Sequence, residues 1–265
     1  MNSAKTAHRI VVKVGTSTLA YPNGRLNIRR IEQLVKVLAD LKNSGREILL
    51  VTSAAIGVGA GLLGLKERPH DVGGKQAAAA VGQCELMYTY DKLFSEYGHQ
   101  TAQVLLTRDV VEDDVRKNNA ANTLARLMEF GALPIINEND TVATEELEFG
   151  DNDTLSAIVA VLAHAELLVL LTDIDGLYTD NPRENPDARR IDVVEEITDE
   201  LLHAAKGAGS PLGTGGMSTK LHAAAIATAD GIPTVVMSGE NPELLYDLLD
   251  GKAAGTLFKA KERAE

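Results

Sequence analysis

Short apolar runs alternate with longer helix-forming segments along almost the whole chain, and this alternation constrains the fold more than any other feature. Each run ends at turn or polar residues, which is typical of strands that are buried on both faces. The runs are Ile10–Val14, Glu47–Val51, Thr101–Leu106, Leu133–Ile136, Leu167–Leu171 and Thr234–Met237. The helical segments are Asn27–Asn43, Val72–Tyr97, Asp113–Phe130, Thr154–His164, Met217–Asp230 and Pro242–Leu249. The pattern predicts an α/β fold in which helices cover both faces of a mostly parallel sheet.

Two long polar connections interrupt this alternation. Residues 137–153 are polar and acidic, and residues 173–211 are rich in Pro, Gly, Asp and Asn. Ligands of open α/β sheets bind beyond the carboxyl ends of the strands, so both connections are candidate walls of a binding site. The chain has 265 residues and is 45% hydrophobic, which suffices for one large domain or two lobes around a shared sheet. We expect a lobe boundary near Thr172.

The charge balance points to a small ligand. The formal net charge is −12, and the sequence contains no cluster of Lys and Arg, so we expect no nucleic-acid partner. The single cysteine, Cys84, permits no intrachain disulfide and is expected to be a small packed side chain in a helix. We see no signal peptide and no run long enough for a membrane helix, so we expect a cytoplasmic protein without membrane contact.

A glycine-rich run near the C-terminus is the first candidate for a phosphate site. It leads into a helix, so its backbone N–H groups lie at a positive helix end beside a lysine. It is not a P-loop, because G-x-x-x-x-G-K-[ST] is absent from the chain. An ordinary glycine loop with a Ser or Thr cap is the alternative. The run consists of Thr214, Gly215, Gly216, Met217, Ser218, Thr219 and Lys220.

The first two strands end in further candidates. Lys13 lies within an apolar strand that continues into Gly-Thr-Ser, and a buried lysine is costly unless an anion meets it. We expect Lys13 to face a phosphate, the alternative being a lysine that extends its ammonium group to solvent. Ser53 follows the second strand at the start of a helix, where it can bind an anion or act only as an N-cap.

Polar residues also follow the next strands. Residues 137–140 read Asn-Glu-Asn-Asp, and residues 150–154 read Gly-Asp-Asn-Asp-Thr at the start of a helix. Carboxylates there can orient the lysines or bind an amino group, although Asp151 or Asp153 can also serve as a helix cap. Thr172 and Asp173 end the fifth strand in a turn that suits a nucleotide's base and ribose.

In this order, these motifs resemble the glutamate-phosphorylating branch of the amino acid kinase family, over nearly the whole length. The resemblance implies a single domain, residues 1–265, with a three-layer αβα sandwich and two lobes. Residues 1–171 would form the acceptor lobe and residues 172–265 the nucleotide lobe. It also implies transfer of phosphate from ATP, with Mg²⁺, to the γ-carboxylate of L-glutamate in proline biosynthesis.

The resemblance further implies roles for individual residues. Lys13, Asp153 and Lys220 would be catalytic, with Lys13 also contacting the nucleotide. The glutamate ligands would be Ser53, Asp140 and Asn152, and the nucleotide ligands would be Thr172, Asp173 and residues 214–220. Proline is an expected feedback inhibitor, and a homo-oligomer, a dimer or tetramer, is the expected assembly.

The sequence departs from the family in two places. Ala54 stands where glycine is usual, which removes conformational freedom close to the ligand. The chain also stops soon after Phe258, so we expect a short form without the RNA-binding-like PUA domain. Two other functions stay open: a kinase for N-acetylglutamate or aspartate, and a non-catalytic amino-acid sensor. Asp140 favours an acceptor with a free amine, and a phosphoryl-transfer set of two lysines and an aspartate argues against a sensor.

Overall fold

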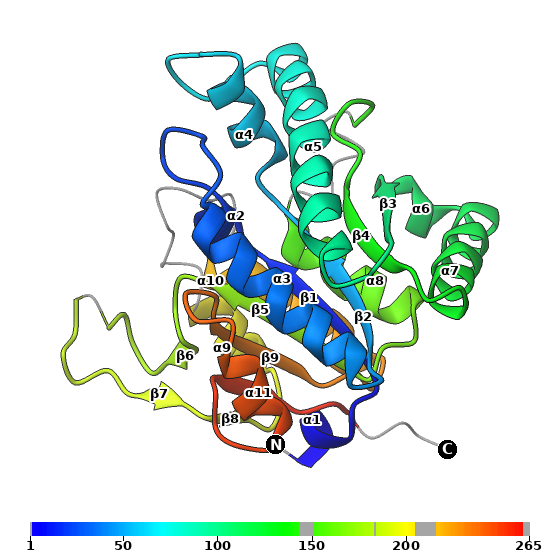
Figure 1. Ribbon diagram of the computed structural model, residues 1–265. Helices are drawn as coiled ribbons and strands as arrows, with labels where there is room; N and C mark the ends of the chain where they lie inside the picture. The colour runs from blue at the N-terminus through cyan, green and yellow to red at the C-terminus, as the bar shows by residue number, and fades with distance from the viewer. Residues whose placement is uncertain (1, 144–150, 183, 205–215, 262–265) are drawn as a thin grey trace.

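The computed structural model describes residues 2–143, 151–182, 184–204 and 216–261 (Figure 1). The helices are α1 (Asn2–Thr6), α2 (Thr16–Leu19), α3 (Ile28–Asn43), α4 (Ala55–Leu62), α5 (Val72–Ser95), α6 (Asp109–Glu112), α7 (Asp114–Glu129), α8 (Asn152–Leu162), α9 (Asp199–Ala204), α10 (Met217–Ala229) and α11 (Leu244–Leu249). The strands are β1 (Arg9–Val14), β2 (Glu47–Val51), β3 (Thr101–Leu106), β4 (Leu133–Glu138), β5 (Leu167–Thr172), β6 (Leu177–Tyr178), β7 (Arg190–Ile191), β8 (Val193–Val194), β9 (Thr234–Ser238) and β10 (Thr256–Phe258).

The central sheet has eight strands in the order β3-β4-β2-β1-β5-β9-β10-β8, and only the β9–β10 pairing is antiparallel. The chain leaves β1 through α3 to β2 on one side, whereas β5 on the other side leads on towards β9. Connections that depart in opposite directions create a crevice at the carboxyl ends of β1 and β5, where ligands of such sheets bind. The predicted fold class, with a mostly parallel sheet, is confirmed.

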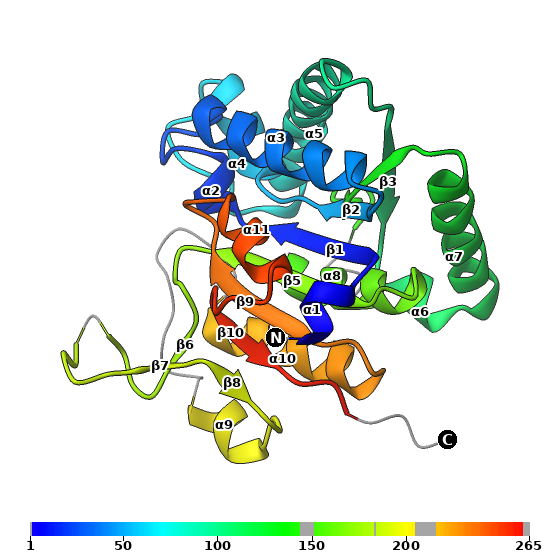
Figure 2. The same cartoon turned by 60° about the horizontal axis from the view of Figure 1, so that its bottom comes forward.

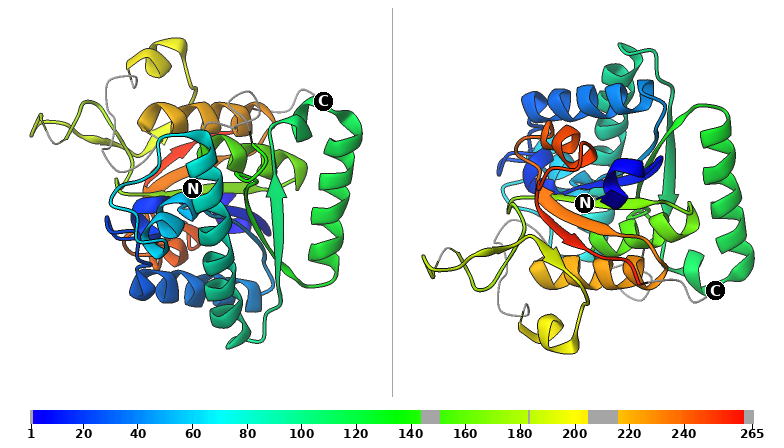
Figure 3. Two further views of the ribbon diagram at one scale, coloured as in Figure 1. Left: turned by 90° about the horizontal axis from the view of Figure 1, so that it is seen from above. Right: turned by 90° about the horizontal axis from the view of Figure 1, so that it is seen from below.

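Helices cover both faces of this sheet, with α3 on one side and α10 on the other (Figure 3). The alternation of side chains along β1 serves both layers. Ile10, Val12 and Val14 join the core beneath α3, while Val11 joins the opposite core with residues of α8 and α10. Because side chains alternate along a strand, Lys13 lies on the same face as Val11, towards α8 and α10.

Each predicted strand and helix is present, with boundaries that differ by a few residues. The sequence pattern missed the short elements α1, α2, α6, α9, β6, β7, β8 and β10. The antiparallel pair β6–β7 belongs to an arm that extends away from the sheet (Figure 2). Within the described ranges, no helix is long and apolar enough to cross a bilayer.

Helices α4 and α5 pack backbone against backbone. A Cβ atom built on Gly59 would lie 1.7 Å from the carbonyl oxygen of Ala78, and one on Gly82 would lie 1.9 Å from that of Ala55. Only glycine allows this approach, so both positions fix α4 against the longer helix. The packed position expected for Cys84 is wrong, because the cysteine is exposed on the outer side of α5. Because this helix is rich in alanine, its sequence does not indicate which side faces solvent.

Candidate active site

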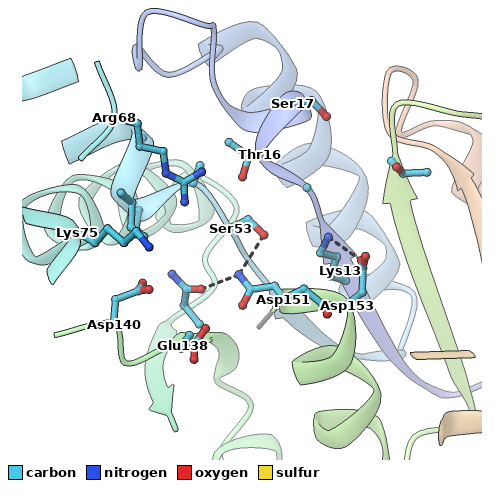
Figure 4. A pocket seen from close by; sticks show the side chains of 18 of the residues that line it. Lys13, Thr16, Ser17, Ser53, Arg68, Lys75, Glu138, Asp140, Asp151 and Asp153 are labelled. Atoms are coloured by element: carbon cyan, nitrogen blue, oxygen red, sulfur yellow. Dashed lines mark hydrogen bonds and ion pairs between the residues drawn. The ribbon is translucent and has the colours of Figure 1, made fainter. Parts of the chain in front are cut away.

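A polar cavity of about 360 Å³ opens at the carboxyl ends of β1, β2, β4 and β5 (Figure 4). It collects most of the residues singled out by the sequence, although they come from segments far apart in the chain. The site residues that line it are Lys13, Ser53, Asp140, Asn152, Asp153, Thr172, Asp173 and Lys220. Thr214 and Gly215 lie outside the described residues. The remaining glycine-run residues, Gly216 to Thr219, are not in the cavity lining, but they begin the helix that carries Lys220.

Two lysines share one carboxylate at the base of this cavity. The ammonium group of Lys13 lies 2.7 Å from Oδ1 of Asp153, and that of Lys220 lies 3.1 Å from Oδ2. All three side chains are buried, with Asp153 only 1% exposed. Lys13 comes from β1, Asp153 from the first turn of α8, and Lys220 from the first turns of α10. Two ammonium groups face one carboxylate, so the cluster has an excess of one positive charge. This excess favours an anionic ligand.

The charges of the two lysines control the ionisation of Asp153. Burial alone would raise the pKa of this carboxyl group. The ammonium groups of Lys13 and Lys220, with hydrogen bonds from Lys13 and Thr219, outweigh burial and lower the pKa to about 2. Asp153 is therefore a carboxylate at neutral pH, and it holds both ammonium groups at fixed positions.

The helix after the glycine run begins at Met217, as the sequence pattern predicts. Gly216 is the N-cap of α10, so Met217, Ser218, Thr219 and Lys220 already belong to the helix. The hydroxyl of Thr219 lies 2.8 Å from both Asp153 Oδ2 and the Gly216 carbonyl oxygen. Thr219 thus ties the start of the helix to the charge cluster, and the positive end of α10 lies beside the lysines.

The turn from β2 into α4 forms the next part of the wall. The N-cap of α4 is Ala54 and not Ser53, so the N-cap alternative for Ser53 does not apply. Ala54 has φ of 82°, in the left-handed region. An alanine there costs about 1–2 kcal/mol of backbone strain, a cost that glycine avoids. The departure from glycine noted in the sequence therefore falls at a position that requires positive φ.

A chain of amide side chains supports this turn. The Asn152 amide nitrogen lies 3.0 Å from Ser53 Oγ, 2.9 Å from Asn137 Oδ1 and 2.7 Å from the Thr52 carbonyl oxygen. Asn137 in turn donates to Gln83 of α5, a buried residue that was not among the predicted site residues. Asp151 is the N-cap of α8 and accepts from the Thr154 N–H. Of the two aspartates, Asp151 therefore has the capping role.

Thr172 and Asp173 lie at the opposite wall, where β5 ends. The Thr172 hydroxyl donates to Asp173 Oδ1 over 3.1 Å, and both residues line the cavity with Lys220. The residues predicted to contact the nucleotide therefore lie on the β5 and α10 side of the charge cluster. Ser53 and Asn152 approach it from the β2 and α8 side.

Two cations that the sequence reasoning missed occupy the far end of the cavity. Arg68, in the connection before α5, and Lys75, in the first turns of α5, face the same space as Asp140 (Figure 4). A usable signal was present: a lysine close to a helix N-terminus opposes the helix dipole and calls for an anionic neighbour. The cavity thus has one cationic cluster at Lys13 and a mixed group of charges at Asp140.

Comparison with known proteins identifies the family of this chain. The model of the amino acid kinase family matches residues 8–238. Glutamate 5-kinase of Clostridium perfringens is 53% identical over 262 residues, covering 97% of each chain, and that of Listeria innocua is 50% identical, covering 98% of this chain and 96% of the relative. Carbamate kinase from Giardia lamblia has the same fold, with a TM-score of 0.69 at 15% identity, covering 97% of this chain and 100% of that one. The chain therefore belongs to the amino acid kinase family and, within it, to the glutamate 5-kinases.

Proposed function

We propose that this protein transfers the γ-phosphoryl group of ATP to the γ-carboxylate of L-glutamate, producing L-glutamyl 5-phosphate, the first step of proline biosynthesis. The observation that carries the proposal is the buried set of Lys13, Asp153 and Lys220 at the base of a polar cavity. The identity of the acceptor is supported by relatives named glutamate 5-kinase that match over nearly the whole chain.

The chemistry follows from the charges of this set. Phosphoryl transfer spreads negative charge over the moving group, and catalysis consists mainly of positioning and electrostatic stabilisation. Lys13 would stabilise the transferring phosphoryl group and Lys220 the leaving β-phosphate, while Asp153 keeps both ammonium groups in place. The acceptor carboxylate is already ionised, so the reaction requires no general base.

The nucleotide would bind on the side of residues 172–265, against Thr172, Asp173 and the start of α10, and glutamate on the side of residues 1–171. Mg²⁺ would enter with the ATP phosphates. Among the described residues, no group of three or more His, Cys, Asp or Glu side chains is placed to hold a metal ion. Mg²⁺ in kinases is commonly carried by substrate phosphates and few protein ligands.

On the acceptor side, Asp140 would bind the α-ammonium group, and Ser53 and Asn152 would position the remainder of the substrate. A carboxylate pairs with an ammonium group but not with a neutral acetamide, so Asp140 favours glutamate over N-acetylglutamate. Proline inhibition and homo-oligomer formation stay predictions from the resemblance, and cytoplasmic location stays a prediction from the sequence composition.

Trapping of the acyl phosphate with hydroxylamine tests the function. Purified protein with ATP, Mg²⁺ and hydroxylamine is expected to form hydroxamate from L-glutamate, and little from N-acetylglutamate or aspartate. The Lys13→Ala variant is the negative control, and Lys92→Ala, an exposed lysine on α5, is the matched control that keeps activity. A preference for another acid would show that the acceptor is not glutamate. If no acid gives a product, a non-catalytic sensor becomes the favoured function.

A further inference from the structure

The far end of the cavity holds cations that the proposed mechanism does not use. Arg68 and Lys75 line the cavity, and neither forms an ion pair with any of the described residues. Lys75 is half-buried, whereas Arg68 is exposed. Figure 4 shows Lys75 beside Asp140, with Lys13 and Asp153 across the cavity. The far end therefore presents a positive and a negative group side by side.

The elements that carry these two groups are held together. The side chain of Gln76, next to Lys75 on α5, donates to the Ala143 carbonyl oxygen over 3.0 Å, which ties α5 to the segment that follows Asp140. Asp71 caps α5 and accepts from the Gly74 N–H over 2.7 Å. Lys75 thus stands on a fixed helix end, unlike Arg68, which lies in the connection before it.

Glutamate has charges that match this arrangement. Its two carboxylates lie at opposite ends of a short carbon chain, so a γ-carboxylate at Lys13 directs the α-carbon towards the far end. We propose that Lys75 binds the α-carboxylate of the acceptor, so that Lys75 and Asp140 together recognise the two charges of an α-amino acid. This inference rests on the proposed function, and it makes Lys75 a residue that determines acceptor specificity.

Arg68 is the weaker candidate for this role. A charge-assisted contact gains most where the cation is already oriented and partly removed from water. Lys75 meets both conditions through its place on α5, whereas an exposed arginine must be ordered when the substrate binds. The positive N-terminal end of α5 adds to the attraction for a carboxylate at Lys75.

Substrates that lack one functional group test the proposal directly. 4-Aminobutyrate is glutamate without the α-carboxylate, and glutarate is glutamate without the α-amino group. We expect Lys75→Met to raise KM for glutamate about ten- to hundredfold, the worth of a hydrogen bond to a charged group, with little change in kcat. The same substitution is expected to leave kcat/KM for 4-aminobutyrate unchanged. Lys92→Met, farther along α5, is the matched control and should affect neither substrate.

Each outcome decides a different point. An unchanged KM for glutamate in Lys75→Met overturns the inference, and so does an equal loss with 4-aminobutyrate, because a merely structural lysine would affect both substrates. If the wild type phosphorylates none of these acids, the proposed function fails. Calorimetric titration of glutamate into wild type and Lys75→Met then tests the contact itself, and equal affinities overturn it. Matching circular dichroism spectra of the variants exclude misfolding as the cause.

Discussion

Replacing Asp153 by asparagine tests how far the buried charge cluster stabilises the fold. The substitution keeps the shape of the side chain but removes the carboxylate that the ammonium groups of Lys13 and Lys220 share. Both lysines are less than 10% exposed, at 7% and 6%, so neither can regain full hydration without movement of the chain. We therefore expect a large loss of stability in the ligand-free protein.

The loss of stability expected for Asp153→Asn can be estimated in two ways. A pKa lowered from 3.8 to about 2 corresponds to roughly 2–3 kcal/mol of preferential stabilisation of the carboxylate in the folded state. Removing one partner of a buried ion pair costs about 3–5 kcal/mol, because an uncompensated charge stays buried. Asp153→Asn should thus lower the free energy of unfolding by about 3–5 kcal/mol. Lys13→Met should cost less, because Asp153 keeps Lys220 as its partner.

Urea denaturation followed by far-UV circular dichroism is the suitable assay, since the chain contains no tryptophan. The triple variant Lys13→Met, Asp153→Asn, Lys220→Met provides the internal control. It removes all three charges of the buried cluster, so it should be more stable than Asp153→Asn alone. A loss below about 1 kcal/mol for Asp153→Asn, or a triple variant no more stable than the single one, would refute the reasoning.

Three further predictions concern pH, packing and catalysis. Folding lowers the pKa of Asp153 to about 2, so the stabilising contribution of its carboxylate is present above about pH 4 and is lost as pH falls towards 2. In acid titrations, the stability difference between wild type and Asp153→Asn should therefore shrink over that range. Gly59→Ala should lower the free energy of unfolding by about 1–3 kcal/mol or more by separating α4 from α5, whereas Gly57→Ala, with open space at its Cβ, should not destabilise the protein; equal urea midpoints would contradict this. Lys220→Ala should lower kcat about a hundredfold or more with little change in KM for glutamate, and an unchanged kcat in steady-state assays would remove Lys220 from the mechanism.

Much of the fold could be read from the sequence because its signals are local. Buried parallel strands appear as apolar runs, and the helices between them show as longer segments of different composition. The short strands β6, β7, β8 and β10 carry no such signal, because two or three residues cannot establish a period. The exposure of Cys84 was missed since alanine-rich stripes look alike on both sides of a helix.

The sequence by itself determined the class of chemistry: a lysine inside a strand, a glycine run that ends in a second lysine, and polar residues where strands end. It could not show that Lys13, Asp153 and Lys220 meet at one point, because they are joined by the pairing of β1 with β5 and the packing of α8 and α10. Nor could it place Lys75 beside Asp140, which lies on another segment of the chain. Only the tertiary structure decided these contacts, because charges far apart in sequence interact only when folding brings them within a few ångströms.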